Sequence, residues 1–300
     1  MIDTTISYNS TQQKEILKVL NYYHVFKHPL RADEIHKFIN IKLNLESLKE
    51  ILNNLITNKE VYLVKGYYCL YNDPILVENR IKGEIKAGKL LVKAKRIGRL
   101  ISFFPFVRFV GISGSLSKGF ADEKTDFDYF IITKTGRLWI CRTILHLFKK
   151  FSFLFNLQKC FCMNYFIDES SMELEDENIY VMYEMATMIP VYNQVCYDKF
   201  INSNKWVTQK LPQFDYNLTG IYNHKSIFKS LLENCFRIFP LNALNSLLMK
   251  ITNYKWKRKW KKANYPNEDY ELAFRTRINI SKNHPKNYQK LLLTKLADFL

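Results

Sequence analysis

The chain has 300 residues, of which 47% are hydrophobic, and its formal net charge is +17. Because it contains 22 Phe and 19 Tyr but only nine Gly and eight Pro, the composition excludes a disordered or low-complexity protein and can support the cores of about two domains. The first residues are too polar for a secretory signal, and no stretch reaches the roughly 20 apolar residues of a membrane span, so we expect no transmembrane segment.

Residues 1–75 predict a winged-helix-like domain. Apolar residues recur at helical spacing in three segments, at about 10–24, 31–38 and 45–58. Two β-rich pieces, VYLV and YYCLY, come next and are joined by Lys65-Gly66, a dipeptide suited to a hairpin turn. Three helices and a hairpin are typical of a winged helix-turn-helix, whose last helix reads DNA in the major groove.

The charge of this first domain disfavours DNA binding. Residues 1–75 contain nine Lys/Arg and eight Asp/Glu, so the excess positive charge of the chain lies downstream. Helix 45–58 carries Glu46 and Glu50 against Lys49 and therefore lacks the positive charge that would attract phosphates. We expect the domain to serve packing or contact with a partner.

The segment from about 77 to 100 predicts a long helix with eight Lys/Arg and two Glu. Its basic residues step by four and three, which places five of them on one stripe: Lys82, Lys86, Lys89, Lys93 and Arg96. Such a stripe is either a solvated face or a contact surface for a nucleotide or nucleic acid, and the sequence leaves both interpretations open.

The segment GSLSKGFADEKTDFDYFIIT, from Gly114 to Thr133, predicts a site for a nucleoside triphosphate and its metal. A β-rich run, VRFVGI, leads into the Gly-Ser turn, and a second run carries Asp126 and Asp128, which share one side of their strand. Glycine lets a phosphate approach the backbone, and Ser115 offers a hydroxyl and an amide N–H. Two crowded carboxylates repel each other unless a cation, most simply a divalent metal, lies between them.

This pattern resembles the nucleotidyltransferase superfamily typified by DNA polymerase beta, the aminoglycoside nucleotidyltransferases and the small MNT-type proteins. The family has a hydrophobic strand, Gly-Ser, a spacer, Asp-hydrophobic-Asp and another hydrophobic strand; here residues 116–125 form the spacer. Small members often read Gly-Ser-x-Ala-Arg-Gly, and Ser117, Lys118 and Gly119 take the last three places. Thr125 stands where members commonly have Ser before the first Asp.

The resemblance implies an α/β (α+β) fold in which residues 76–175 form a nucleotidyltransferase core, a small mixed sheet with flanking helices. It also implies transfer of a nucleoside monophosphate from an NTP to a hydroxyl acceptor, with Mg²⁺ or Mn²⁺ held by the catalytic residues Asp126 and Asp128. Lys118 would contact a phosphate. The residues implied to bind the nucleotide are Gly114, Ser115, Lys118 and Thr125.

The chain departs from the family where active members carry a third carboxylate, in the middle of a later strand. The corresponding segment, CFCMNYFID, has Asn164 at its centre, which can coordinate a metal through oxygen but cannot act as a base. Asp168 has the same strand parity but lies about 13 Å further along an extended strand. Acids from the next loop could also reach in: Glu169, Glu173 and Glu175.

Two interpretations follow from this departure. Either the enzyme works with two acids and a polar third metal ligand such as Asn164, or the chain is a catalytically impaired nucleotide-binding regulator. In the second case the winged helix and a basic tail would contact nucleic acid or a protein partner. Of the two, we favour an active enzyme.

Residues 176–300 read as helices and predict a helical C-terminal domain, which in related transferases helps to form the acceptor pocket. Residues 225–262 contain ten Lys/Arg and one Glu, and Trp256 and Trp260 would share one helix face. Three interpretations stay open: stacking on single-stranded nucleic acid, contact of residues 250–262 with an anionic membrane surface, or a basic helix that the two Trp hold to the core. We expect the hydroxyl acceptor to be a small molecule, an RNA or a protein.

The six cysteines indicate a reduced, cytoplasmic setting. They show no CxxC pair and no histidine at zinc-finger spacing, so we expect buried thiols rather than a metal site. Cys160 and Cys162 would share a strand face and are expected to pack in the core.

Overall fold

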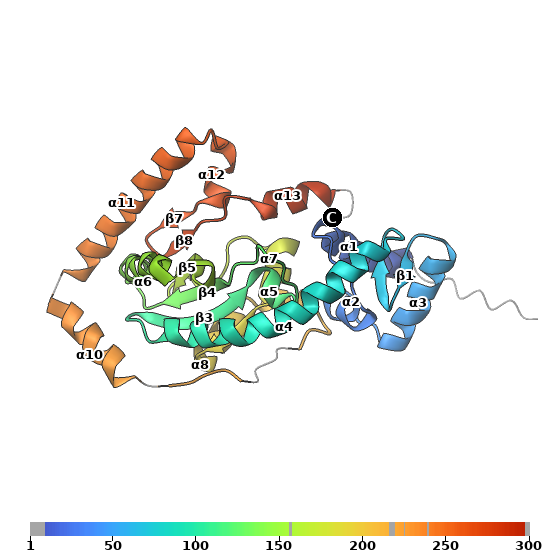
Figure 1. Ribbon diagram of the computed structural model, residues 1–300, viewed down its shortest axis with the longest axis horizontal. Coiled ribbons are helices and arrows are strands. Elements are labelled where there is room, and N and C mark those ends of the chain that lie inside the picture. The colour runs from blue at the N-terminus through green and yellow to red at the C-terminus, as the bar shows by residue number, and fades with distance from the viewer. Residues whose placement is uncertain (1–9, 156–157, 216–219, 225, 239, 298–300) are drawn as a thin grey trace, which may run out of the picture.

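The computed structural model describes residues 10–155, 158–215, 220–224, 226–238 and 240–297 (Figure 1). Helices surround one six-stranded mixed sheet, and a separate two-stranded hairpin lies near the N-terminus. The expected α+β class, with a mixed sheet and flanking helices, is therefore confirmed.

The N-terminal region folds as three helices followed by the hairpin. Its elements are α1 (Ser10–Val25), α2 (Ala32–Phe38), α3 (Leu45–Thr57), β1 (Tyr62–Val64) and β2 (Tyr67–Cys69). Asn44 begins α3 because its side chain accepts a hydrogen bond of 2.8 Å from the amide of Ser47. The hairpin turns at Lys65 and Gly66, as the sequence predicts, and both residues have positive φ.

Helix α4 (Pro74–Ser102) begins earlier than the predicted residue 77. Asp73 caps it by accepting a hydrogen bond of 3.0 Å from the amide of Leu76, and Pro74 fits its first turn. The buried side of α4 includes Ala87, Ala94 and Gly98, and these small residues let the helix lie close against the sheet.

The six-stranded sheet has the order β6-β3-β4-β5-β8-β7. Its strands are β3 (Val107–Ser113), β4 (Asp128–Thr133), β5 (Cys162–Asp168), β6 (Ile189–Tyr192), β7 (Thr276–Arg277) and β8 (Ile280–Lys282). Strands β4 and β5 are parallel and are connected through α6 (Leu138–Ser152), whereas the other neighbours are antiparallel.

Three of these strands correct the expectation that residues 176–300 are wholly helical. Strand β6 contains Pro190, which a sheet tolerates here because β6 is an edge strand. Strands β7 and β8 have two and three residues, too few for an alternating pattern to be recognised. The C-terminal region therefore completes the sheet as well as adding helices beside it.

The remaining helices belong mostly to the C-terminal half. They are α5 (Gly114–Ser117), α7 (Ile179–Ala186), α8 (Gln194–Ser203), α9 (Lys205–Lys210), α10 (Ile227–Cys235), α11 (Leu241–Lys262), α12 (Asn267–Ala273) and α13 (Tyr288–Lys295), with short 3-10 segments at Phe153–Phe155, Gln158–Cys160 and Phe236–Ile238. Among the described residues, every helix is too short or too polar to cross a lipid bilayer.

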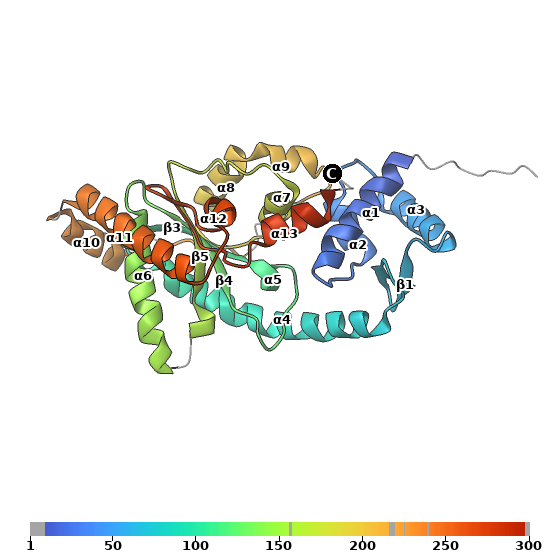
Figure 2. The same ribbon diagram turned by 90° about the horizontal axis from the view of Figure 1, so that it is seen from above.

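The two faces of the sheet pack into two cores because strand side chains alternate. Phe109 and Phe130 belong to the core that also contains α1, α2, α3 and α7, whereas Val110 and Ile131 belong to the core beneath α4 and α6. Figure 2 shows this layering, with α4 and α6 on one side of the sheet and α7, α8 and α9 on the other. The N-terminal helices thus share a core with the sheet.

The two tryptophans of the basic helix α11 are half-buried and pack against other parts of the protein. Trp260 stacks on Phe274 with ring centroids 4.7 Å apart, and Trp256 lies edge-on to the same ring at 6.2 Å. The guanidinium of Arg142 lies 4.7 Å from the Trp256 centroid. Of the three interpretations of this segment, these contacts favour a basic helix that its two Trp hold to the core.

Candidate functional site

The Gly-Ser turn and the acid pair meet where β3 ends and β4 begins, at one end of these two neighbouring strands. Strands β3 and β4 are antiparallel, and Ser113, the last residue of β3, pairs with Asp128, the first residue of β4. Gly114 follows with φ of +71°, and a Cβ added there would lie 2.4 Å from Oδ2 of Asp128. Glycine is favoured at this position because the backbone angle strains a side chain and because the carboxylate occupies the space of a Cβ.

Asp126 and Asp128 lie close enough to influence each other. The expectation that both acids share one side of a strand is wrong, because β4 begins at Asp128: Asp126 is exposed before the strand, and Asp128 is partly buried at its start. Burial raises the pKa of the Asp128 carboxyl to about 6; the thiol hydrogen bond from Cys162 opposes this rise, and the charge of Asp126 adds to it. Within the described part of the chain, neither carboxylate forms an ion pair with a basic side chain.

Lys118 lies beside the glycine turn but is already paired. Its Nζ donates to Oε1 of Glu184 at 2.7 Å and to the carbonyl of Gly114 at 3.3 Å. Glu184 comes from α7 and also raises the pKa of Asp128 through its charge. The sequence reasoning missed Glu184, although it is the single acid in the apolar run IYVMYEMATMI.

Of the other residues implied to bind nucleotide, one lies open at the turn and one stabilises a loop. Ser115 is exposed on α5. The Thr125 hydroxyl donates to Oδ1 of Asp122 at 2.9 Å and accepts from the Asp122 amide at 2.8 Å. Thr125 therefore shapes the loop that precedes Asp126, and its hydroxyl is occupied.

Of the two β5 residues considered as a third metal ligand, Asn164 lies next to Asp128 and Asp168 does not. Asn164 on β5 lies beside Asp128, with its Nδ2 3.5 Å from Oδ1 of Asp128 and 3.0 Å from Sγ of Cys162. Asp168 pairs with Thr133, at the opposite end of β4 from Asp128, and accepts hydrogen bonds from Gly136 and Ser170. Asp168 is therefore too far away to serve as a ligand.

Two of the loop acids lie away from the acid pair, and one of them is Glu169, whose amide donates to the carbonyl of Thr133 at the far end of β4 from Asp128. Glu175 forms ion pairs with Arg275 and Arg277 on the other side of β5 from β4. Across the described residues, no group of three or more His, Cys, Asp or Glu side chains could hold a metal by itself. The candidate metal ligands of this site are the two acids, and Asn164 lies beside one of them with its Nδ2 facing Asp128.

These donors fit a magnesium ion that also binds a triphosphate. Mg²⁺ in nucleotide sites usually takes one or two protein carboxylates, and phosphate oxygens and water complete its shell. The raised pKa of Asp128 indicates a carboxylate that a cation would stabilise. The space that a Cβ at position 114 would fill lies directly against this carboxylate.

The raised pKa of Asp128 predicts how the free energy of unfolding depends on pH. Its pKa in the folded chain is about 6 against an ordinary 3.8, so its charged form destabilises the fold above about pH 6 and this cost disappears as the pH falls towards 4. With a chelator present, we expect Asp128→Asn to stabilise the protein by about 1–2 kcal/mol at neutral pH and by nothing near pH 4. Urea unfolding at both pH values measures this, with the exposed Glu123→Gln as the control.

A stabilisation that is equal at both pH values would contradict this assignment, because it would show that the side chain acts through packing or hydrogen bonding and not through its charge.

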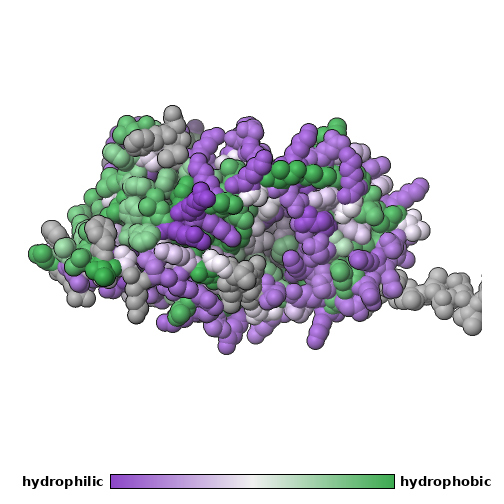
Figure 3. Space-filling view, turned by 60° about the horizontal axis from the view of Figure 1, so that its bottom comes forward, coloured by the Kyte–Doolittle hydropathy of each residue, from purple (hydrophilic) through white to green (hydrophobic). Residues whose placement is uncertain are grey.

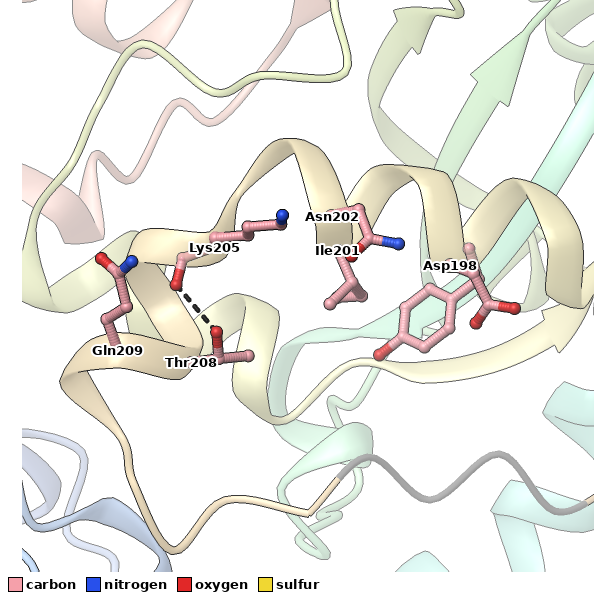
Figure 4. A pocket seen from close by; sticks show the side chains of 7 residues that line it. Asp198, Ile201, Asn202, Lys205, Thr208 and Gln209 are labelled. Atoms are coloured by element: carbon pink, nitrogen blue, oxygen red, sulfur yellow. Dashed lines mark hydrogen bonds between the residues drawn. The ribbon is translucent and has the colours of Figure 1, made fainter.

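A hollow on the surface lies elsewhere. It has a volume of about 420 Å³ and lies along α8 and α9, lined by Tyr197, Asp198, Ile201, Asn202, Lys205, Thr208 and Gln209 (Figure 4). None of these residues belongs to the glycine turn or the acid pair, so this hollow is separate from the candidate site.

Comparison with known proteins finds no relative whose site could be compared with this one. The candidate site combines four of the residues that the sequence singled out, Gly114, Lys118, Asp126 and Asp128, and adds Glu184 to them. No family, no curated protein and no solved structure matches this chain.

Proposed function

We propose that this chain is a nucleotidyltransferase that uses Mg²⁺ or Mn²⁺ to move a nucleoside monophosphate from an NTP to a hydroxyl acceptor. The observation that carries the proposal is the close approach of Gly114 to Asp128, which leaves no room for a methyl group. A turn suited to phosphate and a carboxylate pair suited to a divalent cation thus share one edge of the sheet.

In the proposed reaction, the acceptor oxygen forms a bond to the α-phosphorus and the bond from this phosphorus to the β-phosphate oxygen breaks. Pyrophosphate leaves with that oxygen, and the hydroxyl proton is released to solvent. The cation, held by Asp126 and Asp128, would neutralise the triphosphate and polarise the phosphorus. Gly114 leaves space for the phosphates, and Lys118 would exchange Glu184 for a phosphate oxygen.

A second candidate is a catalytically impaired nucleotide-binding regulator. It is favoured by Asn164, which lies beside Asp128 where a third acid is expected and which cannot take a proton from the acceptor. In this case the chain binds nucleotide without turnover, and its N-terminal helices or basic segments contact nucleic acid or a protein.

The acceptor class stays a small molecule, an RNA or a protein hydroxyl. We place the activity in the cytoplasm, since all six cysteines are free thiols.

Incubation with each α-³²P-labelled NTP, Mg²⁺ or Mn²⁺, and cell extract tests the proposal. We expect label in one class of acceptor, and a loss of at least about 100-fold in the Asp126→Asn, Asp128→Asn double variant. Glu123→Gln, which changes a carboxylate that is 94% exposed, is the matched control and should label normally.

Binding of a fluorescent NTP separates the two candidates. Metal-dependent binding without label supports the regulator, whereas no binding, or label that the double variant retains, contradicts both.

A further inference from the structure

Helix α6 carries an apolar end that projects from the body of the protein (Figure 2). Four large side chains in this region are more than half exposed: Leu147 (60%), Phe151 (60%), Phe153 (56%) and Leu154 (74%). We call these four residues the apolar tip. Leu147, Phe151 and Leu154 step by four and three, so they follow one side of the helix and its 3-10 extension.

The apolar tip continues onto the end of α4. Phe104 contacts Phe148 with ring centroids 4.9 Å apart, and Phe148 in turn contacts Phe161 at 5.3 Å. Leu100 and Phe103, at the end of α4, are also exposed. Figure 3 shows hydrophobic residues gathered on this part of the surface, at the upper left. A contiguous apolar surface of this kind usually marks an interaction site.

Both segments that form this surface contain basic residues and no acidic ones. The sequence has no Asp or Glu between Glu84 and Asp122, or between Asp128 and Asp168. Three lysines of the second segment lie on the last turn of α6 and on the 3-10 segment Gln158–Cys160: Lys149, Lys150 and Lys159. The charges that these two segments contribute are therefore all positive, and the exposed acid Glu123 lies beside Lys159 and pairs with Lys86.

An apolar surface with basic residues beside it favours one kind of binding partner. Leucine side chains cannot stack on bases, so Leu147 and Leu154 would gain little from single-stranded RNA. A second copy of the chain would bring an equally basic face against this one, and the like charges would repel. A bilayer with anionic headgroups accepts both features, since exposed Phe and Leu side chains enter the acyl boundary while Lys and Arg stay at the phosphates.

We propose that the apolar tip and its basic flank dock this protein onto an anionic phospholipid surface. The docking is peripheral: the tip inserts at the headgroup boundary, and the sheet with its candidate site stays outside the bilayer. This inference stands on exposure and charge alone and does not depend on the proposed nucleotidyl transfer.

Cosedimentation with phospholipid vesicles tests the docking surface. We expect the protein to pellet with vesicles that contain about 30% phosphatidylglycerol in phosphatidylcholine, and to stay in solution with phosphatidylcholine alone. Phe151→Ser with Leu154→Ser should weaken the partitioning by at least about tenfold, and so should Lys149→Glu with Lys150→Glu. Salt at about 0.5 M should weaken wild-type partitioning as well.

Leu63→Ser with Tyr71→Ser is the matched control, because it removes apolar side chains that are 49% and 65% exposed near the N-terminal hairpin. We expect this variant to bind vesicles like the wild type, and thermal melts check that all variants are folded. The proposal is overturned if wild type stays in solution with anionic vesicles, or if the tip variant still pellets. It is also overturned if the tip substitutions instead abolish RNA retention or dissociate a dimer.

Discussion

Gly114→Ala is expected to lower nucleotidyl transfer by at least about 100-fold, although it adds a single methyl group. That methyl would lie 2.4 Å from Oδ2 of Asp128 and 3.2 Å from its Cβ. These atoms cannot stay in place, and the carboxylate must turn away from the position in which it would bind the cation. The change also places a Cβ on a backbone with φ of +71°, which costs about 1–3 kcal/mol of folding free energy.

Gly119→Ala separates these two effects. Gly119 has nearly the same backbone angle, +69°, but an added Cβ would meet only one arginine nitrogen, at 4.0 Å. Both alanine variants should therefore lose similar stability in urea, whereas only Gly114→Ala should lose transfer and Mn²⁺ binding, which electron paramagnetic resonance measures without any turnover. If both variants kept the wild-type affinity for Mn²⁺, the contact between Gly114 and Asp128 would have no part in holding the cation.

The meeting of the glycine turn and the acids could be predicted because it depends on local order. VRFVGI and FDYFIIT are short runs rich in β-branched and aromatic residues; the first became β3 with almost the predicted limits, whereas β4 begins at Asp128 and leaves Asp126 before the strand. Antiparallel neighbours bring the end of one strand beside the start of the next, so Gly114 and Asp128 had to lie close together.

The parts of the site that sequence reasoning missed depend on long-range packing. Glu184 reaches Lys118 from a helix 66 residues further along the chain, and no local pattern encodes that contact. Lys118 therefore looked like a free phosphate ligand in the sequence, whereas in the folded chain it is paired. The edge strand β6 was missed for a related reason, since its apolar run reads equally well as the end of α7.

Arg80 links the N-terminal helices to the glycine loop, and its removal should cause the largest loss of stability. It is 1% exposed, and its guanidinium donates to Glu34 of α2 at 2.8 Å and to the carbonyl of Gly119 at 3.0 Å. Arg80→Ala would leave the loop carbonyl without this donor and would remove from the largely buried Glu34 its shortest ion pair, so that Glu34 keeps its hydrogen bonds from Arg31. We expect a loss of about 3–5 kcal/mol in the free energy of unfolding, measured with urea.

Two further arginine variants test whether the expected loss of stability comes from the buried contacts of Arg80 with Glu34 and Gly119. Arg31→Ala removes a neighbour that also pairs with Glu84 but is 37% exposed, so it should cost no more than about 1 kcal/mol. Arg80→Lys keeps the charge but loses the planar fork that reaches Glu34 and Gly119 at once, so its stability should fall between wild type and Arg80→Ala. Equal losses for Arg31→Ala and Arg80→Ala would contradict this account. Because Gly119 follows Lys118 directly, the hydrogen bond from Arg80 joins the N-terminal helices to the loop that carries Lys118.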